Sequence, residues 1–296
     1  MTTVGFIGLG IMGGPMAEHL IAAGHQVSGF SLGDEWGPRL NAAGGRVAAD
    51  IADAVADAEV VITMLPNHPE VEAVVLGEKG VLASARPGAL LMDMSTIRPE
   101  SSTAIATAAA ERGIRVLDAP VSGGEAGARQ ASLSIMVGGT DVDFADALPI
   151  LERMGKTIAH VGQHGAGQTV KAANQLVVAG TYALVAEAIV LLEASGVDAK
   201  AGMDVLAGGL AASRILDLKR ESMLARQFQP GFRIDLHHKD MGIALAAARQ
   251  ADVALPLTGL VAQLVAAGRA MGYGSLDHSA LLKVVEQLSG RVPAEV

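Results

Sequence analysis

The feature that most constrains the fold is a change of pattern near residue 164. Before it, short apolar runs bounded by Gly, Pro, Asp or Asn alternate with helical stretches, which is typical of buried strands joined by helices. The predicted strands span residues 3–7, 26–30, 60–65, 89–94, 115–117, 133–137 and 157–161. Between the earlier strands, the predicted helices span residues 12–23, 69–75 and 99–112. This alternation predicts an α/β fold, a doubly wound parallel sheet with right-handed crossovers.

Beyond residue 164 the strand-like runs end, and only helical patterns punctuated by Gly, Pro and Asp follow. The predicted helices span residues 168–195, 199–206, 213–225, 239–250, 258–271 and 278–288. We therefore predict two domains, an α/β domain over residues 1–163 and an all-α domain over residues 164–296.

The composition excludes several classes of partner. The net charge is −9, whereas nucleic acids and anionic membranes require a basic surface. There is no cysteine, and no Lys or Arg precedes Arg39, which disfavours a secretory signal and fits a cytoplasmic protein. The most apolar stretch, residues 176–192, contains Thr181, Tyr182 and Glu187, so we expect a buried helix and not a membrane span.

A glycine-rich turn follows the first predicted strand and opens the first predicted helix. It reads Gly8-Leu9-Gly10-Ile11-Met12-Gly13. In this setting Gly8 permits a tight turn, Gly10 lets the backbone approach a pyrophosphate, and Gly13 lets the helix pack closely on the sheet. The N–H groups at the helix start favour an anion. The pattern predicts a Rossmann-type dinucleotide-binding domain over residues 1–163.

The end of the second strand leaves the choice of dinucleotide open. An acidic residue there commonly holds the ribose hydroxyls of NAD, and an Arg accommodates the 2′-phosphate of NADP. This chain has Phe30-Ser31-Leu32-Gly33, with neither. Asp34 and Glu35 follow; they either disfavour NADP by repulsion or are solvated loop charges. NAD and NADP therefore both remain.

Three further loops at predicted strand ends have unusual chemistry. They are Pro66-Asn67-His68, Ser95-Thr96 and Ser122-Gly123-Gly124. Ligands of such sheets bind off the carboxyl ends of the strands. Two glycines after a serine can present backbone donors to a carboxylate. No metal site is predicted, because ligand spacing is lacking among His68, His160, His164, His237 and His238.

The long helix of the second domain begins with the segment 165–175, in which Lys171, Asn174 and Gln175 share one face. A lysine followed by about twenty mostly apolar positions is poorly explained as a solvated charge. The sequence favours a proton donor that protonates the oxygen of an aldehyde during hydride addition. The alternative is a lysine that extends its charged end to solvent from the start of the helix. Lys239 is a second candidate cation for the pocket.

Together these motifs resemble the β-hydroxyacid dehydrogenase family, and within it the subgroup that reduces tartronate semialdehyde. The resemblance runs nearly end to end. It comprises GFIGLGIMG at 5–13, ITMLPN at 62–67, MDMSTIRP at 92–99, LDAPVSGGEAGA at 117–128, LSIMVGG at 133–139, GAGQTVKAANQ at 165–175, PGFRIDLHHKD at 230–240 and LDHSAL at 276–281.

The resemblance implies a role for each matching residue. Lys171 would be the catalytic acid/base, and the all-α domain would bind substrate. The substrate set would be Ser122, Gly123 and Gly124, which hold its carboxylate, with Asn174 or Gln175. The cofactor set would be Gly8, Gly10, Ile11, Met12, Gly13, Ser31, Leu65, Pro66, Asn67, Thr96 and Lys239. Ser31 and Leu32 depart from the Asp or Asn-Arg of many relatives.

The implied reaction is the reversible reduction of tartronate semialdehyde to D-glycerate with NADH or NADPH. A small carboxylate-bearing aldehyde would be the substrate, with 3-hydroxyisobutyrate, glyoxylate and succinic semialdehyde as alternatives. A non-catalytic dinucleotide sensor is a second class of function, but it would have no use for Lys171. The apolar helix from Gln168 also predicts a homo-oligomer, either a dimer or a tetramer.

Overall fold

The computed structural model describes residues 1–33 and 35–291, so Asp34 lies outside the described residues. The chain divides into two compact units, Met1–Lys171 and Ala172–Val296. The division falls inside one continuous helix, α9, which spans Ala166–Ala194. The boundary predicted from sequence, after residue 163, precedes this helix.

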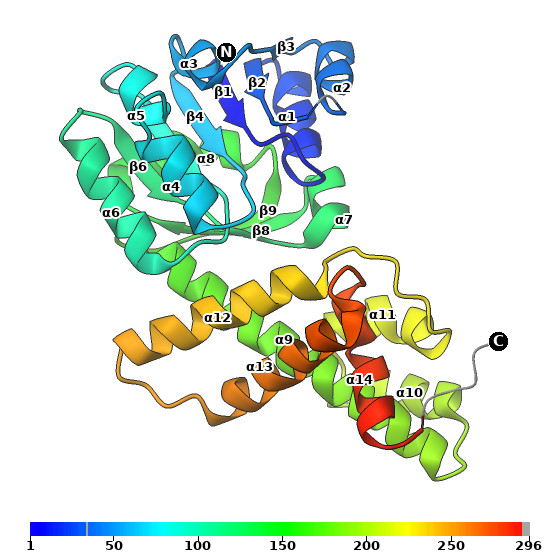
Figure 1. Ribbon diagram of the computed structural model, residues 1–296. Helices are drawn as coiled ribbons and strands as arrows, with labels where there is room; N and C mark the ends of the chain where they lie inside the picture. Colours follow the sequence, from blue (N-terminus) through cyan, green and yellow to red (C-terminus); the bar gives the residue numbers. More distant parts are fainter. Residues whose placement is uncertain (34, 292–296) are drawn as a thin grey trace. The chain divides into compact units, whose positions relative to one another are not determined.

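A mostly parallel sheet forms the centre of the first unit (Figure 1). Its strands are β1 Thr3–Ile7, β2 Gln26–Phe30, β3 Arg46–Val47, β4 Val60–Thr63, β5 Leu90–Asp93, β6 Arg115–Asp118, β7 Val121–Ser122, β8 Leu133–Gly138 and β9 Gly155–Gly162. Strands β1 to β6 are parallel in the order β3-β2-β1-β4-β5-β6. The predicted doubly wound sheet is therefore confirmed, and the order reverses between β1 and β4.

The far side of the sheet departs from the parallel pattern. Strand β8 runs antiparallel to β6 and β7, while β9 is parallel to β8. A parallel return needs a crossover of a dozen or more residues, usually through a helix. The chain between β6 and β8 instead holds β7 and the six-residue helix α7, Gly124–Arg129. Strand β7 has two residues, too few to leave a period in the sequence.

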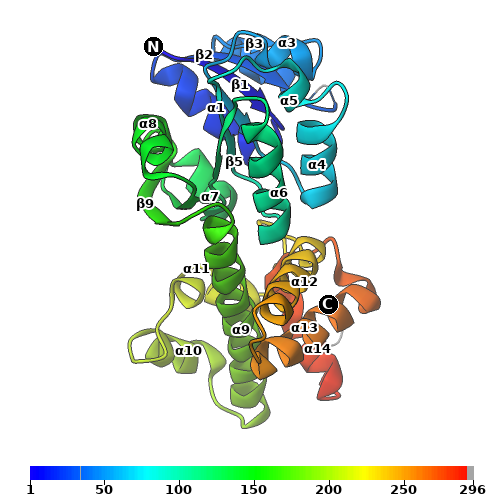
Figure 2. The ribbon, with the colours of Figure 1, turned by 90° about the vertical axis from the view of Figure 1, so that its left-hand side faces the viewer.

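Helices cover both faces of the sheet, as the view along its edge shows (Figure 2). One face carries α3 Ile51–Val55, α4 His68–Leu76, α5 Val81–Ser84 and α6 Pro99–Ala110. The other carries α1 Gly13–Ala22, α7 and α8 Asp141–Leu151. Alternate strand residues enter separate cores: Val60 and Ile62 pack with α1 and α8, whereas Val61 packs with α4 and α6. The continuous apolar runs of the sequence follow from this burial on both faces.

The second unit is helical, as predicted. Besides α9 it contains α10 Ala199–Ala207, α11 Arg214–Leu224, α12 Ile234–Gln250, α13 Pro256–Gly268 and α14 Leu281–Leu288. A π-helical turn, Arg269–Tyr273, and a 3-10 turn, His278–Ala280, precede α14. Helix α12 begins at Ile234, well before the predicted residue 239. The polar residues of its first turns conceal the apolar period there.

Helix α9 is the one helix among the described residues that is long and apolar enough to cross a membrane. Its Ala179, Tyr182, Ala186 and Ile189 are buried in the core of the helical unit, against α10 to α14. We therefore interpret α9 as the core helix of this unit.

The start of α9 packs so tightly that it accepts no side chain at Gly167. A Cβ there would lie 2.4 Å from Met136 O and 2.8 Å from Asp118 O, both backbone atoms. We expect Gly167→Ala to lower the free energy of unfolding by about 2–3 kcal/mol, because the backbone must shift. Gly242→Ala, on the open face of α12, has no atom within 4 Å and should raise it by about 0.5–1 kcal/mol. Urea unfolding compares the two; equal effects would contradict the packing argument.

Candidate active site

The glycine-rich turn between β1 and α1 has the shape that a dinucleotide needs. Gly8 has φ +97°, and a Cβ there would lie 2.3 Å from Met64 O. A Cβ on Gly13 would lie 1.9 Å from Gly8 O, so the helix can approach the turn only without a side chain. Gly10, in contrast, has no atom within 4 Å of its Cβ position. The turn is therefore closed toward the sheet and open on the side where a pyrophosphate would bind.

The start of α1 also fits an anion. The helix begins at Gly13, its cap residue Met12 makes no side-chain hydrogen bond to it, and its first turn holds no acidic residue. The first N–H groups of a helix lack intrahelical partners and form the positive end of its dipole. The residues present thus fit a dinucleotide phosphate.

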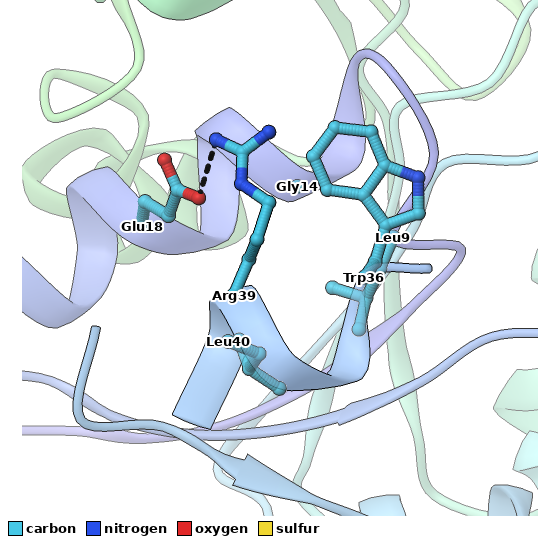
Figure 3. Close-up of a pocket in the computed structure, with 6 residues that line it drawn as sticks. All are labelled: Leu9, Gly14, Glu18, Trp36, Arg39 and Leu40. Atoms are coloured by element: carbon cyan, nitrogen blue, oxygen red, sulfur yellow. Dashed lines mark hydrogen bonds and ion pairs between the residues drawn. The ribbon is translucent and has the colours of Figure 1, made fainter. Parts of the chain in front are cut away.

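Trp36 and Arg39 come from the segment after β2 and lie beside α1 (Figure 3). The Arg39 guanidinium is 4.6 Å from the centroid of the Trp36 ring and 2.8 Å from Glu18 Oε1. Ser31 follows β2 directly, and the next residue, Leu32, is exposed. Sequence reasoning searched residues 30–35 for a carboxylate or an arginine. Arg39 lies outside that range and was missed. The sequence feature that could have indicated it is its position three residues after Trp36, the only tryptophan of the chain.

A buried hydrogen-bond network fixes the loops at the carboxyl ends of β4 and β5. Thr63 Oγ1 donates to Asp93 Oδ1 at 2.7 Å, and Ser95 N donates to the same oxygen at 3.2 Å. Ser95 Oγ accepts from Leu65 N at 2.9 Å. These bonds hold in place the two loops that contain the predicted residues Leu65, Pro66, Asn67 and Thr96.

The same network extends to the first turn of α9. Asp118, at the end of β6, accepts from Gly165 N at 2.8 Å and from Gln168 N at 3.0 Å. Gln168 Oε1 accepts from Ile97 N, and its Nε2 donates to Ser95 O. Lys171 follows Gln168 by one turn and is buried, with 6% of its surface exposed. The backbone position of Lys171 is therefore fixed by the ends of β5 and β6.

The serine-glycine-glycine segment follows Asp118 closely along the chain. Ser122 ends β7 and pairs with Ser134 of β8. Gly123 and Gly124 have φ +136° and +60°, conformations that side chains disfavour. No atom lies within 4 Å of the Cβ position of Gly124. Two consecutive backbone N–H groups in such conformations form a concave surface suited to a carboxylate.

Asn174, Gln175 and Lys239 belong to the helical unit, where Asp240 joins them. Asn174 Nδ2 donates to Gln175 Oε1 at 2.8 Å, and Gln175 Nε2 donates to Asp240 Oδ2. Lys239 Nζ is 3.0 Å from Asp240 Oδ1. Asp240 was not predicted; it follows Lys239 directly, and its near-complete burial is the feature that marks it. It ties α9 to α12 through Gln175.

His237 and His278 support the same part of α9 from within the helical unit. His237 is fully buried, and its Nε2 donates to the carbonyl of Gln175 at 3.2 Å. With the proton on Nε2, its Nδ1 accepts from Nδ1 of His278 at 3.0 Å. We therefore interpret His237 as a residue that supports α9. No group of three or more metal-ligating side chains occurs in the described parts of the chain.

Two buried carboxylates stand out electrostatically. Burial raises the pKa of Asp93 to about 6, although the hydrogen bonds from Ser95 and Thr63 oppose the shift. Asp93 Oδ2 has no hydrogen-bond partner among the described residues. Burial also raises the pKa of Asp118, against the backbone N–H groups of Gly165 and Gln168.

Comparison with known proteins identifies the family. Residues 3–162 match the NAD-binding domain of 6-phosphogluconate dehydrogenase, and residues 165–285 match the NAD-binding region of NADP-dependent 3-hydroxyisobutyrate dehydrogenase. The chain is 42% identical to 2-hydroxy-3-oxopropionate reductase of Escherichia coli over 97% of this chain and 98% of that protein. This chain belongs to the β-hydroxyacid dehydrogenase family. The family prediction made from sequence is confirmed.

Two further relatives span nearly the whole chain. 2-(Hydroxymethyl)glutarate dehydrogenase of Eubacterium barkeri is 39% identical over 97% of this chain and 96% of its own. The structure of 3-hydroxyisobutyrate dehydrogenase of Mycobacterium tuberculosis with L-serine is similar, with a TM-score of 0.87 and 37% identity over 96% and 99% of the two chains. This β-hydroxyacid dehydrogenase is therefore an oxidoreductase that acts on CH–OH groups with NAD or NADP.

The raised pKa of Asp93 predicts a pH-dependent stability. The folded state keeps a proton that the unfolded carboxyl, with its pKa near 3.8, releases at lower pH. Stability should therefore fall as the pH rises from about 4 to about 6, by about 3 kcal/mol for this group. Asp93→Asn keeps the acceptor for Thr63 and removes the charge. The free energy of unfolding of variant and wild type is measured in urea at pH 5 and pH 8. Relative to the wild type, the variant should be more stable at pH 8 than at pH 5. A difference independent of pH would contradict the assignment.

Proposed function

We propose that this enzyme catalyses the reversible reduction of tartronate semialdehyde to D-glycerate, with Lys171 as the general acid. Residues 1–163 are proposed to be the dinucleotide-binding domain, and residues 164–296 the helical substrate and oligomerisation domain. The observation that carries the proposal is a lysine with 6% exposure, held by the Asp118–Gln168 contacts at the strand ends. Because the family acts on CH–OH groups, such a lysine can serve as the proton donor and acceptor of the reaction.

Three elements of the first unit each contribute one part of the proposed mechanism. The open side of the glycine turn at Gly10 binds the pyrophosphate, and the N–H groups that follow Ser122 hold the substrate carboxylate. The nicotinamide, when bound, supplies or accepts the hydride. The Lys171 ammonium stabilises the negative charge that develops on the carbonyl oxygen and donates a proton to it. In the reverse direction the neutral amine removes the proton of the hydroxyl.

In the helical unit we assign the substrate contact to Asn174 and a supporting role to Gln175. Gln175 is buried, and its amide contacts Asn174 through Oε1 and Asp240 through Nε2. These bonds orient the Asn174 amide, which is half-buried. The assignment rests on this pattern of hydrogen bonds.

The choice of tartronate semialdehyde rests on the relative from E. coli, the most similar of the three compared. The other names point to a hydroxymethyl-substituted dicarboxylate and to 3-hydroxyisobutyrate. All three compounds combine a carboxylate with a primary alcohol or the corresponding aldehyde. Glyoxylate and succinic semialdehyde belong in the same test.

The role of Lys171 is tested by Lys171→Ala. We expect kcat to fall by on the order of 10²–10⁴, because the developing oxyanion loses its proton donor. Cofactor affinity, measured by calorimetry, should stay within a few-fold of the wild type. Lys156→Ala, at an exposed position on β9, is the matched control and should keep full activity. Near-full activity of the Lys171 variant would overturn the mechanism.

The substrate is tested by following reduced nicotinamide at 340 nm over the small aldehyde acids named above, with NADH and with NADPH. The highest kcat/KM should be for tartronate semialdehyde. A higher value for another acid would reassign the substrate within the same mechanism. Tight cofactor binding without turnover of any of them would favour the dinucleotide sensor.

We also propose that the chain forms a homo-oligomer through α9. Val177, Leu184 and Leu191 recur every seven residues along this helix, and each exposes more than 60% of its surface. An apolar stripe at this spacing is typical of helix–helix packing.

Leu184→Glu tests the oligomer, because it places a charge in the middle of the stripe. Light scattering at micromolar concentration should give a dimer or tetramer for the wild type and a smaller species for the variant. The control is Val142→Glu. Val142 lies on α8 and is about as exposed as Leu184, so this variant should leave the mass of the particle unchanged. A monomeric wild type would refute the proposal.

A further inference from the structure

The end of β2 lacks the carboxylate that would bind the ribose hydroxyls of NAD, yet the structure brings an arginine to this region. Arg39 lies on α2, Gly37–Ala42, beyond the positions where a sequence motif would place it. Together with Glu18 and Trp36 it forms a group that we call the Arg39 cluster (Figure 3).

The backbone of Arg39 is fixed by packing against the sheet. The neighbouring Leu40 is buried, with 2% of its surface exposed. A Cβ on Gly29 of β2 would lie 2.7 Å from the Leu40 side chain, so α2 sits directly on the carboxyl half of this strand. The backbone of α2, in which Arg39 directly precedes Leu40, is therefore held against the carboxyl half of β2.

The guanidinium of Arg39 is held in place as well. It lies over the Trp36 ring, with 4.6 Å to the ring centroid, and donates to Glu18 of α1 at 2.8 Å. Trp36 itself packs on the first turn of α1, where a Cβ on Gly14 would lie 2.4 Å from its ring. These contacts place a cation beside the helix whose start fits the pyrophosphate.

From this geometry we propose that Arg39 binds the 2′-phosphate of NADP and that the enzyme prefers NADP to NAD. In a doubly wound sheet the adenosine ribose lies near the end of the second strand, and an arginine there accommodates the 2′-phosphate. A guanidinium has five N–H donors, so it can keep Glu18 while donating to a phosphate. Arg39 keeps 42% of its side chain exposed, which leaves it accessible to a ligand.

The charges nearby are consistent with this assignment. Glu18 fixes one edge of the guanidinium and balances its charge in the absence of phosphate. Glu35 lies in the loop before α2 and is exposed, so salt and solvent screen its repulsion of a phosphate. Ser31, the first residue after β2, has a hydroxyl that can donate to a phosphate oxygen, whereas a carboxylate at that position would repel it.

The test measures binding of two nicotinamide-free fragments to the full-length enzyme by calorimetry. Adenosine 2′,5′-bisphosphate and adenosine 5′-monophosphate differ only in the 2′-phosphate. The wild type should bind the bisphosphate about 10- to 100-fold more tightly, the range expected of charge-assisted hydrogen bonds. Arg39→Gln should abolish most of this ratio and leave the affinity for the monophosphate within about two-fold. Equal affinities in the wild type would overturn the proposal.

Arg46→Gln is the matched control, because Arg46 is another exposed, ion-paired arginine in the same part of the fold, bound to Asp53. It should keep the wild-type ratio; loss of the ratio in this variant as well would assign the effect to general charge and overturn the role of Arg39. Arg39→Lys should recover only part of the ratio, because it keeps the charge but not the fork of donors. Full insensitivity of the ratio to every Arg39 variant would likewise reject the assignment.

Trp36 provides a second readout, since it is the only tryptophan of the chain. Titration with the bisphosphate should change its emission in the wild type, and this change should weaken in Arg39→Gln at the same ligand concentration. No change in the wild type at saturating bisphosphate would contradict binding beside Trp36. These measurements require no turnover, so they succeed or fail independently of Lys171 and of the substrate.

Discussion

The contact on which the site depends most is the one between Asp118 and the first turn of α9. A buried carboxylate at the end of β6 accepts two backbone N–H groups of the helix start, which satisfies donors that a helix leaves unpaired. Gln168 extends the contact to the end of β5. Because Lys171 lies one turn further along a rigid helix, its backbone position is set by the sheet. The close packing of the same turn on Met136 and Asp118 also excludes a side chain at Gly167.

The parts of the fold that sequence reasoning recovered are those encoded by local pattern. The strand over Gln26–Phe30 was predicted to the residue, and the glycine turn was identified because its conformations need glycine at fixed spacing. Arg39 was missed because its approach to Glu18 depends on how α2 packs on β2, which no local period encodes. Asp240 was missed for the same reason, since its partner Gln175 is distant in the chain.

Burying acidic groups among the strand ends lowers the stability of the folded state, because the charged carboxylates lose solvent. Asp93 lies between Thr63 and Ser95, and the loss of solvent raises its pKa despite both hydrogen bonds. A neutral residue at this position would remove the desolvation cost but would accept these hydrogen bonds less strongly. The benefit of the carboxylate is geometric, because one oxygen binds the end of β4 to the loop after β5. That loop contains Thr96, and its neighbour holds Leu65.

Helix α9 combines constraints that act on different faces and at different positions. Its first turn is bound to the sheet by Asp118, and Gln175 is bound to α12 through Asp240. Further along, Tyr182 and Ile189 fill the core of the helical unit. Lys171 lies between the two bound segments, so a shift of the helix at either one moves the lysine. A substitution that loosens either Asp118 or Asp240 would therefore act on the same residue, the proposed general acid Lys171, although Asp118 and Asp240 belong to different units of the chain.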